Sequence, residues 1–369
     1  MKITLTKESL SHGLQTVQNV VGARSTLPIL GNVLLIAEKG KLEMRATDLD
    51  VSVVSAVEAQ TEREGMTTLP AKRLFGLVRE IPEGDVEIEV NNKEVCTISA
   101  GPAEYKLNGL AAEEFPPLPK FKESQSLSLP QERLGDMLRK TAYAVSTDES
   151  RYQLNGICFS VAKDRLTLVA TDGRRLALTW EELEANSERD FIVPTKAVNE
   201  LSRAVGDAGV VEMRVSDSQV EFTISQEGEP VRLYSKLVEA SYPNYKQVIP
   251  TEHEDTQRIE LVREELLQAL RRADQITSDK ANSVKLNFTA NNLAITANSP
   301  EVGSGHDSIA IKYKGGDIEV AFNPGYMMDP LKIMEEDEVC LKIKDSLTAG
   351  ILDTKGSNFM YVIMPMRTN

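Results

Sequence analysis

A short strand followed by an amphipathic helix occurs three times in this chain, and this repeat most constrains how the chain folds. In the first copy, residues 3–17, apolar and polar residues alternate up to Thr6, and apolar residues then recur at helical spacing. Thr6 stands where the N-cap of the helix is expected. The pattern returns without a gap at residues 127–138 and 259–270, at offsets of 124 (127 minus 3) and 132 (259 minus 127). We therefore predict three repeated domains.

The register between the first two copies extends well beyond the helix. At the same offset of 124, Leu30 corresponds to Leu154. The Ala-Thr-Asp segment at 46–48 likewise corresponds to an identical segment at 170–172. A chance match between two strand and helix pairs does not hold its register over such a distance, so the repeat is real.

The first third of the chain contains a finer repeat of the same kind. The pattern of residues 5–14 returns at residues 69–78, an offset of 64 (69 minus 5). Each domain is thus expected to be α+β and to consist of two half-units, each with a strand, a helix and further strands. A chain of 369 residues suits roughly three domains of about 120 residues. We place the domains at residues 1–122, 123–252 and 253–369, with the proline-rich segment 115–119 as a linker.

Local patterns predict the elements inside these domains. In the first domain we expect strands at residues 32–37, 41–47, 51–58, 86–90, 94–99 and 105–107. In the second domain we expect a helix at residues 131–145. In the third domain, Asn323 and Pro324 are typical of a helix N-cap and of the first helical position. Pro330 falls inside the same helix, which predicts a kink or a short helix there.

The composition is that of a globular protein and disfavours several classes. No apolar run approaches the roughly 20 residues of a membrane span, and no leader precedes Met1, so we expect a cytosolic protein that binds no membrane. Cys96, Cys158 and Cys340 lie far apart in the sequence. Their spacing favours buried, reduced thiols over a metal site.

Motifs that carry catalysis are absent from the sequence. No Gly-Lys-Ser/Thr phosphate loop, His-Glu-x-x-His zinc motif or Gly-x-Ser-x-Gly elbow occurs, and the histidines His12, His253 and His306 are scattered. We expect no enzymatic activity, no catalytic residue, no cofactor and no metal. Asp48, and Asp172 in the equivalent turn, could ligate a metal, although such turns also use aspartate for backbone geometry alone.

Basic residues recur on the predicted helices at corresponding points of the repeats, although the net charge is −14. For any single residue, a solvated helix face is a sufficient explanation. Their recurrence predicts instead a surface on which lysine and arginine gather while the acids lie elsewhere. Such a surface makes phosphate contacts that do not depend on base sequence.

Several stretches are together highly specific for one family. They are Thr-Leu-Pro-Ile-Leu-Gly-Asn at 26–32, Leu-Asn-Gly at 154–156, Val-Ala-Thr-Asp-Gly at 169–173 with Arg-Leu-Ala at 175–177, Ser-Lys-Leu-Val at 235–238, and Tyr-Val at 361–362 with Met-Pro-Met-Arg at 364–367. Through them the chain resembles, over essentially its full length, the β subunit of bacterial DNA polymerase III, the replicative sliding clamp. The resemblance implies three similar domains with helices inside and sheets outside. It also implies two chains closed head-to-tail into a ring around duplex DNA.

The resemblance further implies three sets of site residues. A cleft between the second and third domains would bind peptides of the DNA polymerase III catalytic subunit, the clamp loader and other replication and repair proteins. Its residues would be Leu154, Thr171, Gly173, Arg174, Arg175, Leu176, Pro243, Val248, Asn323, Tyr326, Leu347, Val362, Met364, Pro365, Met366 and Arg367. Duplex DNA would contact, without sequence specificity, Arg24, Lys72, Arg73, Arg139, Asp148, Arg151, Tyr152, Lys196, Arg271, Arg272 and Lys280. The homodimer would close at Tyr105 and Ile276, and the acid Asp148 is expected to weaken phosphate contact.

Two other classes of function stay open from the residues alone. One is an adaptor that is built from the same repeats and binds protein partners without encircling DNA. The other is an enzyme whose site is too dispersed to recognise. The adaptor would show no salt-sensitive retention on closed circular DNA. An enzyme would need acids or histidines with perturbed pKa values gathered in a pocket.

Overall fold

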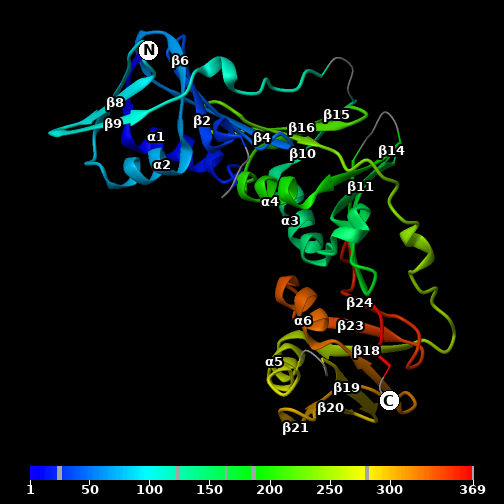
Figure 1. Cartoon of the computed structure of the whole chain (residues 1–369). Coiled ribbons are helices and arrows are strands. Elements are labelled where there is room, and N and C mark those ends of the chain that lie inside the picture. Colours follow the sequence, from blue (N-terminus) through cyan, green and yellow to red (C-terminus); the bar gives the residue numbers. More distant parts are fainter. Residues whose placement is uncertain (23–26, 122–124, 163, 184–187, 279–281, 368–369) are drawn as a thin grey trace. The chain divides into compact units, whose positions relative to one another are not determined.

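The computed structural model describes residues 1–22, 27–121, 125–162, 164–183, 188–278 and 282–367. The chain forms two compact units (Figure 1). The first consists of Met1–Gly135 with Val193–Leu237, and the second of Asp136–Ile192 with Val238–Asn369. Within the described ranges, no helix is both long and apolar enough to cross a membrane.

The predicted threefold repeat of a strand and a helix is present. Its copies are β1 (Lys2–Thr6) with α1 (Lys7–Gln18), β10 (Gln125–Pro130) with α3 (Gln131–Thr141), and β18 (Gln257–Val262) with α5 (Arg263–Asp274). The side chain of Thr6 accepts a hydrogen bond from the backbone N–H of Ser9 at 3.2 Å, which confirms the predicted N-cap. The helix predicted for 131–145 is an α-helix only to Thr141, and a 3-10 turn over Ala142–Ala144 follows it.

The offset of 124 also holds for the elements that follow. The strands β2 (Asn32–Glu38), β3 (Lys41–Thr47), β4 (Val51–Glu58) and β6 (Gly65–Pro70) and the helix α2 (Ala71–Glu80) correspond to β11 (Gly156–Ala162), β12 (Arg165–Thr171), β13 (Arg175–Glu182), β14 (Arg189–Pro194) and α4 (Thr195–Ala204). Each element begins 124 residues after its counterpart, for example Asn32 and Gly156. The strand and helix that the repeated pattern at residues 69–78 predicts are confirmed as β6 and α2.

Two sheets form the first unit. A five-stranded sheet has the order β5-β1-β7-β8-β9, and an eight-stranded sheet has the order β10-β15-β16-β17-β4-β3-β2-β6. The strands not yet given are β5 (Gln60–Arg63), β7 (Asp85–Val90), β8 (Val95–Ala100), β9 (Ala103–Asn108), β15 (Val210–Val215), β16 (Gln219–Ile224) and β17 (Val231–Lys236). In the first domain, for which strand positions were predicted, β5 was not expected from the sequence.

The sheets of the second unit follow the same plan. An eight-stranded sheet has the order β14-β11-β12-β13-β25-β24-β23-β18, and a four-stranded sheet has the order β21-β20-β19-β22. The new elements are β19 (Val284–Thr289), β20 (Asn292–Ser299), β21 (Gly303–Ala310), β22 (Ile318–Phe322), α6 (Pro324–Ile333), β23 (Glu338–Ile343), β24 (Gly350–Asp353) and β25 (Phe359–Ile363).

Each eight-stranded sheet consists of two four-stranded halves that come from neighbouring repeats. At the first joint, β17 pairs antiparallel with β4, and Leu233 lies opposite Val53. At the second joint, β13 pairs antiparallel with β25, and Ala177 lies opposite Tyr361. Val53 and Ala177 are 124 residues apart (177 minus 53), so both joints have the same register. The middle repeat thus gives one half-sheet to each unit, and the three domain boundaries stay a prediction.

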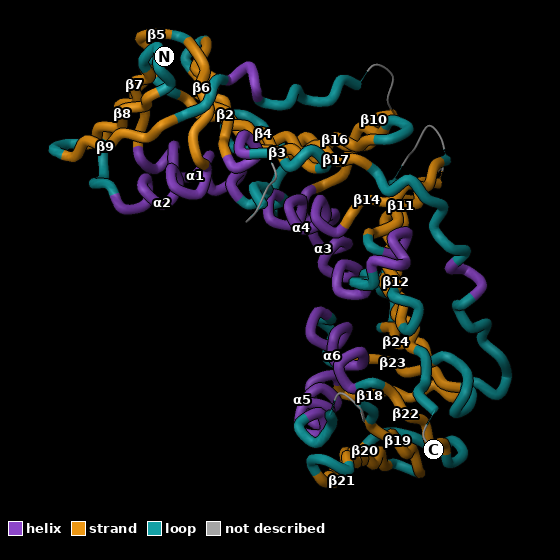
Figure 2. The backbone as a smooth tube through the Cα atoms, viewed as in Figure 1, coloured by secondary structure: helices purple, strands orange, loops and turns teal. Residues whose placement is uncertain are grey.

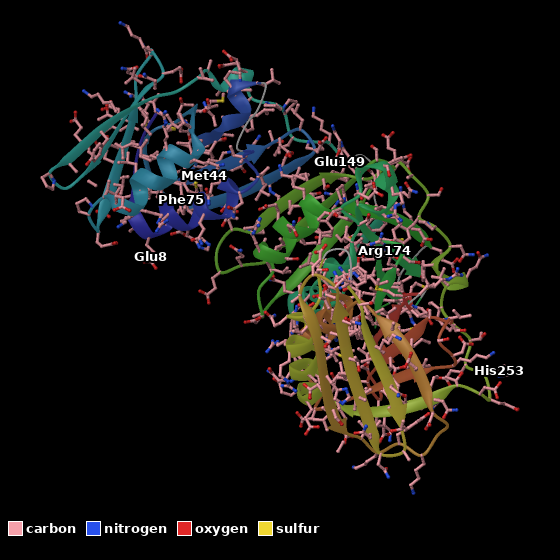
Figure 3. The ribbon with its side chains drawn as sticks, turned by 60° about the horizontal axis from the view of Figure 1, so that its bottom comes forward. Glu8, Met44, Phe75, Glu149, Arg174 and His253 are labelled. Atoms are coloured by element: carbon pink, nitrogen blue, oxygen red, sulfur yellow. The ribbon has the colours of Figure 1, made fainter. Side chains whose placement is uncertain are left out.

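The α-helices of each unit lie on one side of its strands. Figure 2 shows α1, α2 and α4 along one side of the first unit's strands, and α5 and α6 along one side of those of the second. The inward side chains of α1, such as Leu10 and Leu14, are fully buried. Met44 of β3 reaches α1 (Figure 3), where a Cβ added to Gly13 would lie 2.0 Å from the methionine Cε. The absence of a side chain at Gly13 therefore lets the helix pack closely on the sheet.

The sequence predicted a kink or a short helix at Pro330; helix α6 continues through this proline, so Pro330 does not end the helix, and the kink stays a prediction. Asn323 is the N-cap, as predicted, since its side chain accepts a hydrogen bond from the N–H of Tyr326 at 3.0 Å. The helix ends only at Ile333 and has 10 residues, as α2 does. Because proline has no N–H, the carbonyl of Tyr326 lacks its helical donor. The hydroxyl of Tyr361 donates to this carbonyl at 2.8 Å instead.

Candidate functional sites

An apolar surface covers the second joint. Leu176 and Val362 lie opposite each other across it. Because side chains alternate along a strand, this surface is on the face opposite to Tyr361, whose hydroxyl reaches α6. Its buried members are Cys158, Val169, Leu176, Leu178, Ala349, Ile351 and Val362, and Trp180, Tyr242, Tyr245, Ile249 and Met360 pack on them. Burial raises the pKa of the Cys158 thiol to about 12, so this cysteine is an apolar packing residue rather than a nucleophile.

Large apolar side chains at the border of this surface are exposed to solvent. Val248 is 53% exposed, Leu347 70%, Met364 45% and Met366 38%. Leu347, Met364 and Met366 lie within four residues of a buried member of the surface, and Val248 is next to Ile249, which packs on it. A concentration of exposed apolar side chains next to a buried cluster is typical of a surface that binds a partner. The flexible methionines suit partners of varied shape.

The equivalent face of the first joint mixes polar and apolar side chains, since buried Val54 lies opposite Arg232. Where the second joint has Leu176 opposite Val362, the first has Ser52 opposite Tyr234. Arg232 of this face pairs with the carboxylate of Glu43 at 2.8 Å. The two joints share one backbone register, so only their side chains distinguish them. Among the described residues, this face is therefore more apolar at the second joint than at the first.

The turn between β12 and β13 borders the apolar surface. Its conformation depends on Asp172, whose Oδ1 accepts hydrogen bonds from the N–H groups of Arg174 at 2.8 Å and Arg175 at 3.0 Å. Gly173 has a φ of 85°, and a Cβ there would lie 2.8 Å from Nη1 of Arg151. Asp172 thus has the structural role that the sequence left open, and the described residues contain no cluster of potential metal ligands.

Arg175 lies on the helix side of the second joint rather than among the apolar residues. Its Nε contacts Asp172 at 3.1 Å, and its Nη2 donates to the carbonyl of Tyr143 at 2.6 Å. Its Nη1 donates to Asp329 of α6 at 2.5 Å, and the guanidinium lies 4.3 Å from the ring centre of Tyr326. The side chain is only 10% exposed. Arg175 therefore holds α6 against β13, and Tyr326 and Asn323 belong to this helix side as well.

Two backbone hydrogen bonds fix the C-terminal segment beside the apolar surface. The N–H of Met364 donates to the carbonyl of Arg174 at 2.9 Å, and that of Met366 donates to Ala321 at 2.7 Å. The loop that carries Leu347 is fixed by Asp345, which accepts from the N–H of Leu347 at 2.8 Å. This contact and those with Thr348 lower the pKa of the Asp345 carboxyl below its usual value.

The predicted cleft residues fall into distinct places. Leu176 and Val362 lie in the surface, Val248, Leu347, Met364 and Met366 border it, and Leu154 is buried. Thr171 donates from its Oγ1 to the carbonyl of Arg175 at 2.5 Å, and Arg174 is exposed at the turn (Figure 3). Pro243, Pro365 and Arg367 lie next to members of these groups in the chain. Residues that the sequence did not single out are Tyr242, Tyr245, Ile249, Ala349, Ile351 and Met360. Alternation with Val362 would have indicated Met360.

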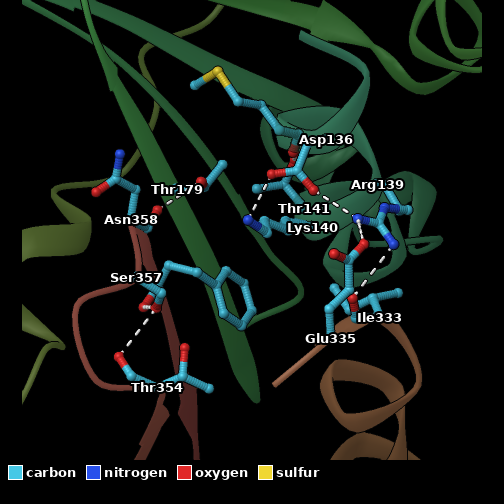
Figure 4. Close-up of polar contacts among 12 residues, drawn as sticks. Asp136, Arg139, Lys140, Thr141, Thr179, Ile333, Glu335, Thr354, Ser357 and Asn358 are labelled. Atoms are coloured by element: carbon cyan, nitrogen blue, oxygen red, sulfur yellow. Dashed lines mark hydrogen bonds and ion pairs between the residues drawn. The ribbon is translucent and has the colours of Figure 1, made fainter. Parts of the chain in front are cut away.

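Several basic residues that were predicted to contact DNA are engaged by acids. Arg139 donates to Asp136 at 2.7 Å, to Glu335 at 2.9 Å and to the Ile333 carbonyl at 3.4 Å (Figure 4). Burial alone would raise the pKa of Asp136, but Lys140 and Arg139 more than offset it and lower that pKa. Similar ion pairs join Lys196 to Asp48 and Arg272 to Asp307. Lys72, Arg73 and Arg271 are exposed, whereas Arg24 and Lys280 lie outside the described residues.

Asp148 and Arg151 form one local unit in the loop that was predicted to contact DNA. Asp148 accepts a hydrogen bond from the N–H of Ser150 at 3.0 Å, and its Oδ2 lies 3.0 Å from Nε of Arg151. The contacts with Ser150 and then Arg151 lower the pKa of the Asp148 carboxyl. Tyr152 is 57% exposed beside them. Asp148 thus partly neutralises Arg151.

Comparison with known proteins relates the whole chain to one family. Models for the DNA polymerase III beta subunit match in order: the N-terminal domain at residues 1–119, the central domain at 128–244 and the C-terminal domain at 246–367. The beta sliding clamp of Chlamydia trachomatis is 36% identical over 376 residues, which cover 100% of this chain and 87% of that protein. The structure of the Bacillus subtilis DNA polymerase sliding clamp matches with a TM-score of 0.94 and 30% identity, over 100% of both chains. That of the Pseudomonas aeruginosa beta subunit matches with a TM-score of 0.93 at 30% identity, again over 100% of both chains.

Proposed function

The chain belongs to the family of DNA polymerase III β subunits, the sliding clamps, and from this premise we propose that two copies of it close a ring around duplex DNA. The ring would hold replication and repair proteins on DNA by binding their peptides, and it would act by tethering rather than by catalysis. The observation that carries this proposal is the pair of equivalent joints, of which one has an apolar outer face. The adaptor reading is not favoured, because the matches to sliding clamps span the full chain.

The two joints support a specific arrangement of the dimer. β9 is the end strand of its sheet. It is the fourth strand of the half-sheet β1-β7-β8-β9, just as β17 and β25 are the fourth strands of β10-β15-β16-β17 and β18-β23-β24-β25. Tyr105 of β9 corresponds to Leu233 and Tyr361, because each of the three pairs with an equivalent apolar residue of the preceding strand. Unlike β17 and β25, β9 has no further strand beyond it in the described sheet. It is therefore the counterpart of the strands that form joints.

β21 supplies the other half of such a joint. It is an end strand and has the position of β4 and β13. Its Gly305 corresponds to Val53 and Ala177, because all three pair with an alanine of the neighbouring strand. If the subunit joint has the register of these two joints, Tyr105 of the partner subunit lies opposite Gly305. We call this contact of β21 with the partner's β9 the subunit joint.

Ile276 supports this register. A Cβ at Gly305 would lie 3.1 Å from Cγ1 of Ile276. The absence of a side chain at Gly305 leaves room for the ring of the partner's Tyr105 to pack on Ile276. Tyr105 is 47% exposed in the single chain, so this packing would remove a large apolar area from water. A dimer with two such joints closes on itself.

DNA would be held by encirclement rather than by strong contacts. The net charge is −14, and acids engage several of the basic residues predicted to contact phosphate. A closed ring needs few contacts to stay on DNA, and weak contacts permit sliding. Exposed Lys72, Arg73 and Arg271 on the helices support sequence-independent phosphate contact.

Retention on circular DNA tests the proposed encirclement. The protein, loaded onto nicked circular duplex, is expected to stay bound when salt is raised and to leave once the circle is cut. Salt weakens phosphate contacts but does not open a topological link. Equal lifetimes on the circle and on the cut DNA would contradict encirclement and favour a DNA-independent adaptor.

A further inference from the structure

The register of the proposed subunit joint brings two titratable side chains together. We propose that His306 forms a cross-strand pair with Glu104 of the partner subunit, and that this pair closes the ring more tightly when the imidazole is protonated. The inference rests on the proposed dimer. It concerns the strength of closure and its dependence on pH.

The pairing follows from the antiparallel register. If Tyr105 of the partner subunit lies opposite Gly305, the next pair along the strands is Glu104 opposite His306. The second joint shows the same step, since Met360 lies opposite Leu178 next to the pair of Tyr361 and Ala177. Residues directly opposite in such a ladder have Cβ atoms about 4.5–5.5 Å apart on one face of the sheet. An imidazole and a carboxylate at this distance can form an ion pair.

Both side chains are exposed on the surface of the single chain. The Glu104 side chain is 61% exposed, and His306 is exposed on β21. The face that they share is the equivalent of the apolar face of the second joint. Here it carries polar residues instead, including Thr296, whose Oγ1 lies 3.5 Å from Nδ1 of His306.

The other charged groups around His306 are already paired. Asp307, the next residue, lies 2.7 Å from Arg272, which lowers the pKa of that carboxyl. On the strand beyond Thr296, Lys285 pairs with Glu319 at 3.3 Å. From the facing strand, Lys106 of the partner subunit would lie opposite Ser304, and in the single chain it lies 3.4 Å from Glu104. Glu104 is thus the carboxylate that the subunit joint adds next to His306.

The sign of the pH effect follows from the imidazole. Histidine side chains change charge near pH 6.5, whereas a glutamate is ionised above about pH 5. The facing carboxylate favours the protonated imidazole in the dimer, so proton binding and association support each other. The dimer is therefore more stable at a pH at which the imidazole is protonated than at a pH at which it is neutral. A closed dimer has two such pairs, so a cross-strand pair of ordinary strength lowers the dimer Kd about two- to thirty-fold.

The test is the dimer Kd of the full chain at about pH 6 and pH 8, measured by sedimentation of labelled protein at low concentration. The wild type is expected to bind more tightly at the lower pH by the stated factor. His306→Gln and Glu104→Gln should each remove this pH difference. His253→Gln, which changes an exposed histidine remote in sequence from the joint, should keep it. The exchanged pair, Glu104→His with His306→Glu, should restore it.

Each contrary result has a distinct meaning. A wild-type Kd that is equal at both pH values, or a difference that persists in His306→Gln, overturns the pair while leaving the dimer in place. Failure of the exchanged pair to restore the difference also overturns it. A wild type that is monomeric at both pH values, or a Tyr105→Arg variant that dimerises like the wild type, overturns the subunit joint itself.

Discussion

Replacing Tyr361 by phenylalanine tests how helix α6 tolerates Pro330. The Tyr361 hydroxyl donates to the Tyr326 carbonyl at 2.8 Å, and Pro330 has no N–H to take its place. A buried acceptor that loses its partner costs about 1–3 kcal/mol. Because this carbonyl is only partly buried, we expect Tyr361→Phe to destabilise the second joint by about 1–2 kcal/mol.

A second substitution isolates the cause. Pro330→Ala supplies an N–H four residues after Tyr326, which can donate to the orphaned carbonyl within the helix. In this background Tyr361→Phe should cost less, by about 1 kcal/mol. The coupling arises because the hydroxyl and the restored amide compete for one acceptor.

Hydrogen exchange of β25 and α6 amides provides the measurement, since it reports the free energy of opening of these segments. Tyr313→Phe is the matched control. Its hydroxyl donates to the Gly316 carbonyl at 2.6 Å in the same repeat, so it should show no coupling to Pro330→Ala. Equal costs of Tyr361→Phe with and without Pro330 would refute the reasoning, because the hydroxyl would then not replace the missing amide.

Three further outcomes are expected. Deleting residues 364–369 removes two methionines that border the apolar surface. The affinity for a polymerase-type peptide should then fall more than about tenfold in an anisotropy titration, while retention on circular DNA persists. Unchanged affinity would place the peptide site elsewhere. Ile276→Arg places a charge in the proposed subunit joint and should give a monomer in sedimentation, whereas a persisting dimer would argue for a different interface. Asp148→Ala frees Arg151, so the salt dependence of DNA binding should steepen by about one unit of slope. Because the pKa of Asp148 is lowered, its ion pair with Arg151 is present at neutral pH and is lost only as the pH falls through that pKa. An unchanged salt dependence of DNA binding in Asp148→Ala would show that Arg151 does not contact phosphate.

The sequence by itself determined the repeats and the ends of several elements. The constant offset of 124 placed β2 to α2 against β11 to α4, and Thr6 and Asn323 marked two helix starts. These features depend on interactions between residues a few positions apart, such as a cap that binds the N–H two or three residues later. Short-range rules therefore suffice to predict them.

Only the tertiary structure decided which strands join and which side chains are shared between repeats. The pairing of β17 with β4 and of β13 with β25 gives two units from three repeats, although no local pattern distinguishes these edges. The same holds for Arg139, which meets Glu335 almost 200 positions along the chain, and for Tyr361, which satisfies a carbonyl that Pro330 leaves without a donor. The physical reason is that edge pairing, ion pairs and orphaned carbonyls depend on neighbours distant in sequence, which become neighbours only when the sheets have formed.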